Sequence, residues 1–221
     1  MANIIGTNGN DTLVGSDLDD TINGKTGNDI IGNSYGNDTL TGGGGNDKFV
    51  YDLLNGNDII TDFDGIGKGV NPSAGVIAEV DTLSFQGAGF TAQNLLLTQN
   101  GNNLGIDFEG AINSGYAAGF AGPLVILQNF ALENLDNLSK STGATVNLGN
   151  ILFNGQTSIT DSFDVFNANS TQSTIFNKNT VTFLNDLNNK AITCSLEAMA
   201  MILSLPLVPS STTTPARTIA L

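Results

Sequence analysis

Apolar residues recur every nine positions near the start of the chain, and polar turn formers fill the intervals between them. In the unit 42–50, six turn formers precede a three-residue strand, 48–50, with one inward-facing side chain. Such a unit cannot bury its apolar side chain alone, so the pattern predicts a stacked spiral of short strands. The recurring apolar positions are Leu13, Ile22, Ile31, Leu40 and Phe49.

An aspartate precedes each of these apolar residues by two positions. Two turns make one coil, so residues 18 apart lie in neighbouring coils at the ~4.8 Å strand spacing. Carboxylates about 5 Å apart repel by about 1 kcal/mol in water, and by several times that at a lower dielectric. Aspartates stacked in rows along the edges of the spiral therefore predict bound cations. Asp29→Ala should lower the stability of the fold more than a change at Asp11 or Asp58, which lie near the ends of these rows. One edge carries Asp11, Asp29 and Asp47, and the other carries Asp20, Asp38 and, from a looser sixth copy, Asp58.

Carboxylates and turn carbonyls are the oxygen ligands that this segment offers to a metal. The chain has no His and one Cys, which excludes zinc or copper sites of the usual kind. Magnesium demands strict octahedral geometry and keeps its water, whereas a turn rich in carbonyls suits calcium. The sequence therefore predicts Ca²⁺, bound with a dissociation constant of about 10⁻⁴–10⁻³ M.

The five units GTNGNDTLV, GSDLDDTIN, GKTGNDIIG, NSYGNDTLT and GGGGNDKFV resemble RTX, or hemolysin-type, calcium-binding repeats of the pattern GGxGxDxUx. The resemblance implies an all-β fold, a parallel β-roll in which sixth-position aspartates and turn carbonyls bind Ca²⁺. Leu18 and the pair Asn33-Ser34 depart from the expected glycines, so their turns should be weaker sites. The implied ligands are Asp11, Asp20, Asp29, Asp38, Asp47 and Asp58, with backbone groups at Gly9, Gly27, Gly36, Gly45 and Gly56.

The resemblance continues beyond the repeats. The segment DKFVYDLLNGNDIITDFDG is similar to the closing part of the roll in RTX proteins, and VDTLSFQGAGF is similar to the strand that follows. An insertion rich in glycine and small residues, at about 66–79, separates the two. The resemblance implies Asp62 and Asp81 as terminal calcium ligands.

Four segments follow from these patterns. Residues 1–65 form the calcium-binding roll, and 66–155 form a β-rich extension, roll-like or sandwich-like, that closes it. Residues 156–190 add short strands, as further coils or as a separate small β-domain. Residues 191–221 lack glycine and are expected to be disordered or a short helix. Codons for 196–201, shifted by two bases, can spell GGxGxD. We therefore hypothesise that this tail is an out-of-frame translation of further repeats in a truncated chain.

Charge restricts the partners. The net charge is −14 with seven Lys and Arg residues, which makes nucleic acid and anionic membranes poor partners.

The apolar stretch 196–208 is too short to span a membrane. The start of the chain has neither the charged nor the apolar region of a Sec signal. The resemblance implies type I secretion through a C-terminal signal, and so an extracellular location.

The absence of His excludes a Ser/His/Asp triad, a Cys/His pair and an HExxH zinc site. A carboxylate-pair glycosidase or lyase stays open, although no acidic residue outside the rows shows a local signature. The sequence predicts a secreted, non-catalytic protein that binds calcium and folds on binding it. Two alternatives stay open. One is a structural or adhesive surface protein that binds a glycan or a protein. The other is a detached module of a larger secreted toxin or enzyme. The repeats begin at Met1, which counts against this second alternative.

Overall fold

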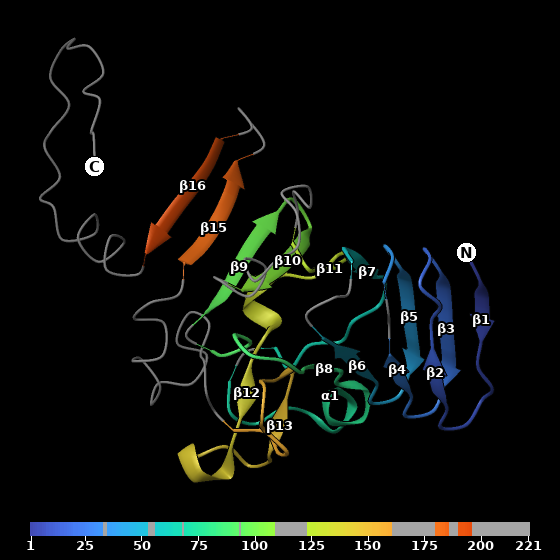
Figure 1. Cartoon of the computed structure of the whole chain (residues 1–221). Helices are drawn as coiled ribbons and strands as arrows, with labels where there is room; N and C mark the ends of the chain where they lie inside the picture. The colour runs from blue at the N-terminus through green and yellow to red at the C-terminus, as the bar shows by residue number, and fades with distance from the viewer. Residues whose placement is uncertain are drawn as a thin grey trace, which may run out of the picture.

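Short strands alternate between two facing sheets along the first 85 residues (Figure 1). The computed structural model describes residues 1–32, 35–52, 56–67, 69–92, 94–108, 123–160, 180–185 and 190–195, with backbone only for the last two ranges. The first sheet starts with β1 (Asn3–Ile5), β3 (Thr21–Thr26), β5 (Thr39–Gly44) and β7 (Asp58–Ile60). The second sheet is built from β2 (Thr12–Val14), β4 (Ile30–Gly32), β6 (Lys48–Tyr51), β8 (Thr82–Phe85) and β14 (Ile151–Leu152).

The register of these strands confirms the predicted stacking. Ile4 pairs with Ile22 and Ile22 with Leu40 in parallel register, so each coil lies 18 residues after the one below it. In the second sheet, Leu13 pairs with Ile31 and Ile31 with Phe49 at the same spacing. A strand has a side-chain period of two, so each three-residue strand directs its middle residue inward. The apolar position of every repeat thereby enters the space between the sheets.

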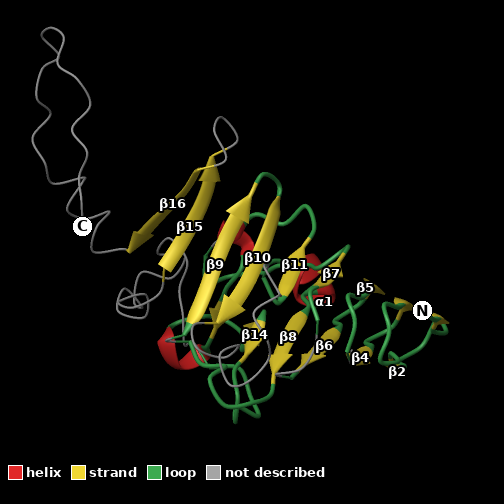
Figure 2. Ribbon diagram, turned by 45° about the horizontal axis from the view of Figure 1, so that its top comes forward, coloured by secondary structure: helices red, strands yellow, loops and turns green. Residues whose placement is uncertain are grey.

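The segment after the repeats continues both sheets. β8 pairs with β6 and β14 with β8, while β11 (Val125–Leu127) lies parallel to β7. From β11 onward the first sheet becomes largely antiparallel, through β10 (Asn103–Phe108) and β9 (Leu95–Asn100) (Figure 2). Two further strands, β15 (Thr180–Asn185) and β16 (Lys190–Ser195), complete it.

Smaller elements lie between the last strands. β12 (Asn137–Leu138) and β13 (Leu148–Gly149) form a two-stranded sheet, next to the 3₁₀ helices η1 (Leu132–Asn134) and η2 (Lys140–Thr142). β16 covers residues 191–195, so the expected disorder or helix is wrong for the start of the tail. The rest of that segment, with the proposed frameshift at 196–201, lies outside the described residues.

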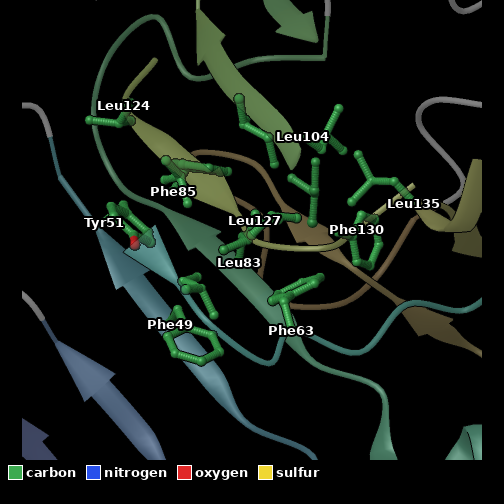
Figure 3. Close-up of a cluster of buried hydrophobic side chains, with 14 of the residues drawn as sticks. Phe49, Tyr51, Phe63, Leu83, Phe85, Leu104, Leu124, Leu127, Phe130 and Leu135 are labelled. Carbon is green, nitrogen blue, oxygen red and sulfur yellow. The ribbon is translucent and has the colours of Figure 1, made fainter. Parts of the chain in front are cut away.

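The hydrophobic core thickens toward the closing end of the roll (Figure 3). Each repeat coil after the first adds one fully buried apolar side chain per strand, such as Ile31 or Leu40. The closing end instead gathers aromatic rings: Phe85 lies 4.7 Å from Phe108 and 5.3 Å from Phe90 between ring centroids. Aromatic side chains carry large buried areas, so this end holds more hydrophobic stabilisation per residue than the repeats.

The insertion at 66–79 contains a six-residue helix, α1 (Ala74–Glu79), which the sequence pattern does not predict. Ser73 caps its start by accepting a hydrogen bond from the Val76 N–H. The last turn of the helix covers the turn at 45–46. Asn46 Nδ2 donates to the Ile77 and Val80 carbonyls, and Glu79 Oε2 accepts from the Gly45 N–H. The insertion therefore occupies the place of the next turn on this edge. Among the described residues, no helix is long and apolar enough to cross a membrane.

Candidate metal centre

The aspartates form two continuous rows of hydrogen bonds along the edges of the roll. In each row the backbone N–H of one aspartate donates to Oδ1 of the aspartate in the next coil, at 2.7–2.9 Å. The bonds hold every carboxylate over the turn below it. The Asp29 row consists of Asp11, Asp29, Asp47 and Asp81, and the Asp38 row consists of Asp20, Asp38 and Asp58.

The second oxygen of three carboxylates in these rows has no hydrogen-bond partner in the described part of the chain. These atoms are buried Oδ2 atoms of Asp29, Asp38 and Asp47. A buried carboxylate oxygen without a partner is costly, because it has lost its water and gained nothing in exchange. Cations bound along the two rows would satisfy these three atoms.

The first glycine of a repeat keeps a space open beside such an oxygen. A methyl group on Gly24 would overlap Asp29 Oδ2 and would lie 2.6 Å from the carbonyl oxygen of Gly42 in the next coil. A carboxylate oxygen and a carbonyl oxygen from successive coils therefore border one space that any side chain would fill. In the Asp38 row, a methyl group on Gly15 would lie 3.3 Å from Asp20 Oδ2 and 3.6 Å from Asp38 Oδ2. These residues fit a calcium ion held between coils by carboxylates and carbonyls.

Electrostatics in the described residues also favour a cation. Burial raises the pKa of Asp47 to about 6, and the negative charges of Asp29, Asp62 and Glu79 add to the increase. Burial likewise raises the pKa of Asp38, with a contribution from Asp20. Within the described ranges, the ion pair found at the rows is between the Met1 amine and Asp20, at 3.7 Å. No cluster of three or more acidic, His or Cys side chains is found there, so each ion would depend on carbonyl oxygens as well.

The first two repeats satisfy their carboxylates without a metal. Thr7 donates its backbone N–H and its hydroxyl to Asp11 Oδ2, and Ser16 does the same for Asp20. These bonds from Ser16, with one from the Ala2 N–H, lower the pKa of Asp20 to about 2. The Leu18 turn is one that the sequence predicts to be weak; the Asn33-Ser34 pair lies outside the described residues.

Of the two predicted terminal ligands, Asp81 closes the Asp29 row. Asp81 follows Asp47 in the Asp29 row although 34 residues separate them, because the insertion bulges out of the coil. Its Oδ2 accepts from the Asp64 N–H at 2.8 Å, and burial raises its pKa to about 8. Asp62 accepts from the N–H groups of Gly42 and Gly43. Calcium ligation by either residue remains a prediction.

The glycines in the fourth position of the repeat have a structural reason of their own. Gly27, Gly36 and Gly45 have φ values of 117–118°, and a side chain there would run into the backbone of the coil below. Gly56 stacks on Gly36 in the same way, while Gly9 lies in the first coil. The carbonyls of first-position glycines, such as Gly24 and Gly42, border the open spaces, and calcium ligation by backbone groups of the fourth-position glycines remains a prediction. Glycine recurs at that position in the repeats.

A second set of side chains, at the fifth position of the repeat, joins the turns in the opposite direction; the sequence pattern does not predict it. Asn10 Oδ1 accepts from the Asn28 N–H at 2.8 Å, and Asn28 Oδ1 accepts from the Asn46 N–H at 3.1 Å. On the other edge, Asn37 donates to Asp19 and accepts from the Asn57 N–H. The fifth position of the repeat therefore orients the turns whose sixth position carries the carboxylate.

Two glycine substitutions test whether the turns stack on one another, because Gly27 lies on the turn of another coil and Gly9 does not. We expect Gly27→Ala to destabilise the calcium-loaded roll by roughly 2–4 kcal/mol, because its φ is +118° and the new methyl would lie 2.6 Å from the Gly9 carbonyl carbon. Gly9→Ala should change stability by less than about 0.5 kcal/mol, since the nearest atom, Thr7 Oγ1, is 3.9 Å away. Urea unfolding in saturating calcium measures both. Similar losses in the two variants would contradict the stacking.

A comparison with models of known protein families agrees with the repeats seen in this geometry. The family model of the RTX calcium-binding nonapeptide repeat (4 copies) matches residues 3–31 and 34–60. A search of curated proteins finds no match. Among solved structures, the chain is similar to the AlgE6R3 subunit from the Azotobacter vinelandii mannuronan C5-epimerase, at 19% identity. That match covers 72% of this chain and 94% of the other, with a TM-score of 0.20, which does not establish a shared arrangement in space.

The repeats, their parallel sheets and the rows of aspartates define residues 3–60 as an RTX-type β-roll, as the sequence predicts. This part of the chain therefore consists of RTX-type repeats, and Ca²⁺ is the metal that such repeats bind.

Proposed function

We propose that this protein is a secreted, non-catalytic module that folds when calcium ions bind between successive turns of its roll. The observation that carries the proposal is the set of three buried Oδ2 atoms, on Asp29, Asp38 and Asp47, without hydrogen-bond partners in the described residues. Each belongs to a row in which the neighbouring carboxylate lies one coil away.

Calcium supplies positive charge where the rows concentrate negative charge. Asp29 Oδ2 and the Gly42 carbonyl belong to different coils, so an ion that binds both joins the coils. The corresponding residues of the Asp38 row, Asp20 and Asp38, face one space beside Gly15. Because the ligands come from separate coils, a complete site exists only in the folded chain. Binding and folding are then one transition.

Composition and the calcium gradient support secretion. Cytosolic calcium is too low to fill sites with a dissociation constant of about 10⁻⁴–10⁻³ M, whereas extracellular calcium is high enough. The chain would therefore stay unfolded during export and fold outside. The lack of His and the single Cys support a role without catalysis, since the usual nucleophile and base pairs cannot be built.

Isothermal titration calorimetry tests calcium binding directly. We expect about three Ca²⁺ per chain, one for each partnerless Oδ2 atom, with an affinity of about 10⁻⁴–10⁻³ M. Magnesium at the same concentration should give no comparable heat, because it resists exchanging its water for carbonyls. The triple variant Asp29→Asn, Asp38→Asn, Asp47→Asn is the control and should bind little calcium. A wild-type chain that takes up no calcium at 10-fold the expected dissociation constant would refute the proposal.

A further inference from the structure

The second residue of the repeat satisfies the carboxylate in the first two turns. Thr7 donates its N–H and its hydroxyl to Asp11 Oδ2, at 2.5 and 2.9 Å. Ser16 donates the same two groups to Asp20 Oδ2, at 2.6 and 2.7 Å. Both residues keep a negative φ. The N–H of the peptide group between the first and second positions therefore points at the carboxylate, and that oxygen needs no ion.

The same position has the opposite backbone conformation in the third and fifth repeats. Lys25 and Gly43 have positive φ values, of 81° and 102°. The Oδ2 atoms of Asp29 and Asp47 in these turns are buried and have no hydrogen-bond partner in the described residues. The Gly43 N–H donates instead to Asp62. A positive φ is costly for a lysine, so the surrounding fold holds Lys25 in this conformation against its preference.

The reversal of one peptide group accounts for the difference between the two kinds of turn. Type I and type II turns are related by such a reversal, which moves φ of the following residue from about −90° to about +80°. The reversal exchanges the directions of an N–H and a C=O. An N–H satisfies a carboxylate oxygen directly, whereas a C=O adds a second oxygen for a cation. The carbonyls of Gly24 and Gly42, which belong to the two reversed peptide groups, are those that border the spaces between coils.

The space beside Asp11 isolates the effect of the second residue. A methyl group on Gly6 would lie 2.8 Å from Asp11 Oδ2 and 2.6 Å from the carbonyl oxygen of Gly24. A carboxylate oxygen and a carbonyl oxygen from the next coil likewise border the space beside Asp29 Oδ2. The two spaces therefore have the same pair of oxygens. They differ in that the N–H and hydroxyl of Thr7 already satisfy the carboxylate in the first.

We propose that the second residue of a repeat decides whether its turn binds a calcium ion. A serine or threonine whose N–H and hydroxyl reach Oδ2 closes the turn, and a residue with a positive φ leaves the carboxylate to the ion. This inference rests on the proposed calcium function and names the residues that set which turns take part in it. Lys25 and Gly43 mark turns that bind an ion, and Thr7 and Ser16 mark turns that do not. The fourth repeat has Ser34 at this position, outside the described residues.

Thr7→Gly tests the proposal, because it removes the hydroxyl and permits a positive φ at an exposed position. Calorimetry should count one more calcium ion per chain than in the wild type. Thr7→Ser keeps both donors and should leave the count unchanged. The urea midpoint of Thr7→Gly should lie below the wild-type value at low calcium and recover at saturating calcium, because the added ion replaces the lost hydrogen bonds. An equal loss at both concentrations would show that Thr7 serves only the local structure.

Lys25→Thr is the reverse test. A β-branched residue rarely adopts a positive φ, so the turn should close as the Thr7 turn does, and the chain should bind one ion fewer. Lys48→Thr, the same change on strand β6, is the matched control and should keep the wild-type count. If Lys25→Thr does not fold, Thr7→Gly decides. An unchanged count in Thr7→Gly would overturn the inference and leave the proposed function intact, whereas a wild-type chain that binds no calcium would overturn both.

Discussion

We expect a chelator to convert residues 1–60 from β-structure to coil, and millimolar calcium to restore the roll. The repeat coils bury little apolar surface, one side chain per strand, while carboxylates gather along both edges. At 10 mM calcium and a dissociation constant of about 10⁻⁴–10⁻³ M, each ion stabilises the fold by about 1.4–2.7 kcal/mol. Three such ions contribute as much as the whole stability of a small domain, at about 5 kcal/mol.

Far-ultraviolet circular dichroism during a calcium titration measures this transition. The curve should be sigmoidal, because one ion orders turns that also contribute to the next site. Sodium chloride at high concentration is the control, since screening alone weakens the repulsion but provides no ligand for the buried oxygens. Equal β-structure in chelator and in calcium would contradict the expectation. Hydrogen exchange should show a smaller effect at the closing end, where Phe85, Phe90 and Phe108 pack together.

The register of the roll could be predicted from the sequence because the repeat determines it. A nine-residue period with one apolar residue requires two strands per coil, and this places Asp11 beside Asp29 and Asp20 beside Asp38. The prediction needs no long-range information, since every coil repeats the contacts of the one before. For the same reason the burial of Ile22, Ile31, Leu40 and Phe49 follows from the pattern.

The features that break the repeat could not be predicted in this way. Helix α1 has no buried residue, so it lacks the periodic apolar pattern that identifies helices; its contacts with Gly45 and Asn46 arise only in the folded chain. The spacing of 34 residues between Asp47 and Asp81 depends on that insertion.

After the removal of calcium, the replacement of Asp29 should have the largest effect on folding. Asp29→Asn keeps the acceptor for the Asp11 N–H but removes the charge from a buried Oδ2 that no other described group satisfies. We expect the calcium midpoint of folding to rise by about tenfold or more, because an ion bound to a single remaining carboxylate loses at least about 1.4 kcal/mol. Asp11→Asn is the matched control in the same row and should shift the midpoint by less than about twofold, since Thr7 already satisfies Asp11 Oδ2.

The burial of Asp58 changes one expectation drawn from the sequence, namely that substitutions at either end of the rows have a smaller effect than a substitution at Asp29. Asp58 is fully buried, its Oδ1 accepts from the Asp38 N–H, and β11 covers it where its own N–H donates to the Leu124 carbonyl. We therefore expect Asp58→Asn to cost about as much as Asp29→Asn, and only the Asp11 end to be tolerant. Calcium titrations of the three variants, followed by circular dichroism, separate these cases. Equal shifts for Asp11→Asn and Asp29→Asn would show that the partnerless oxygens do not bind the ions.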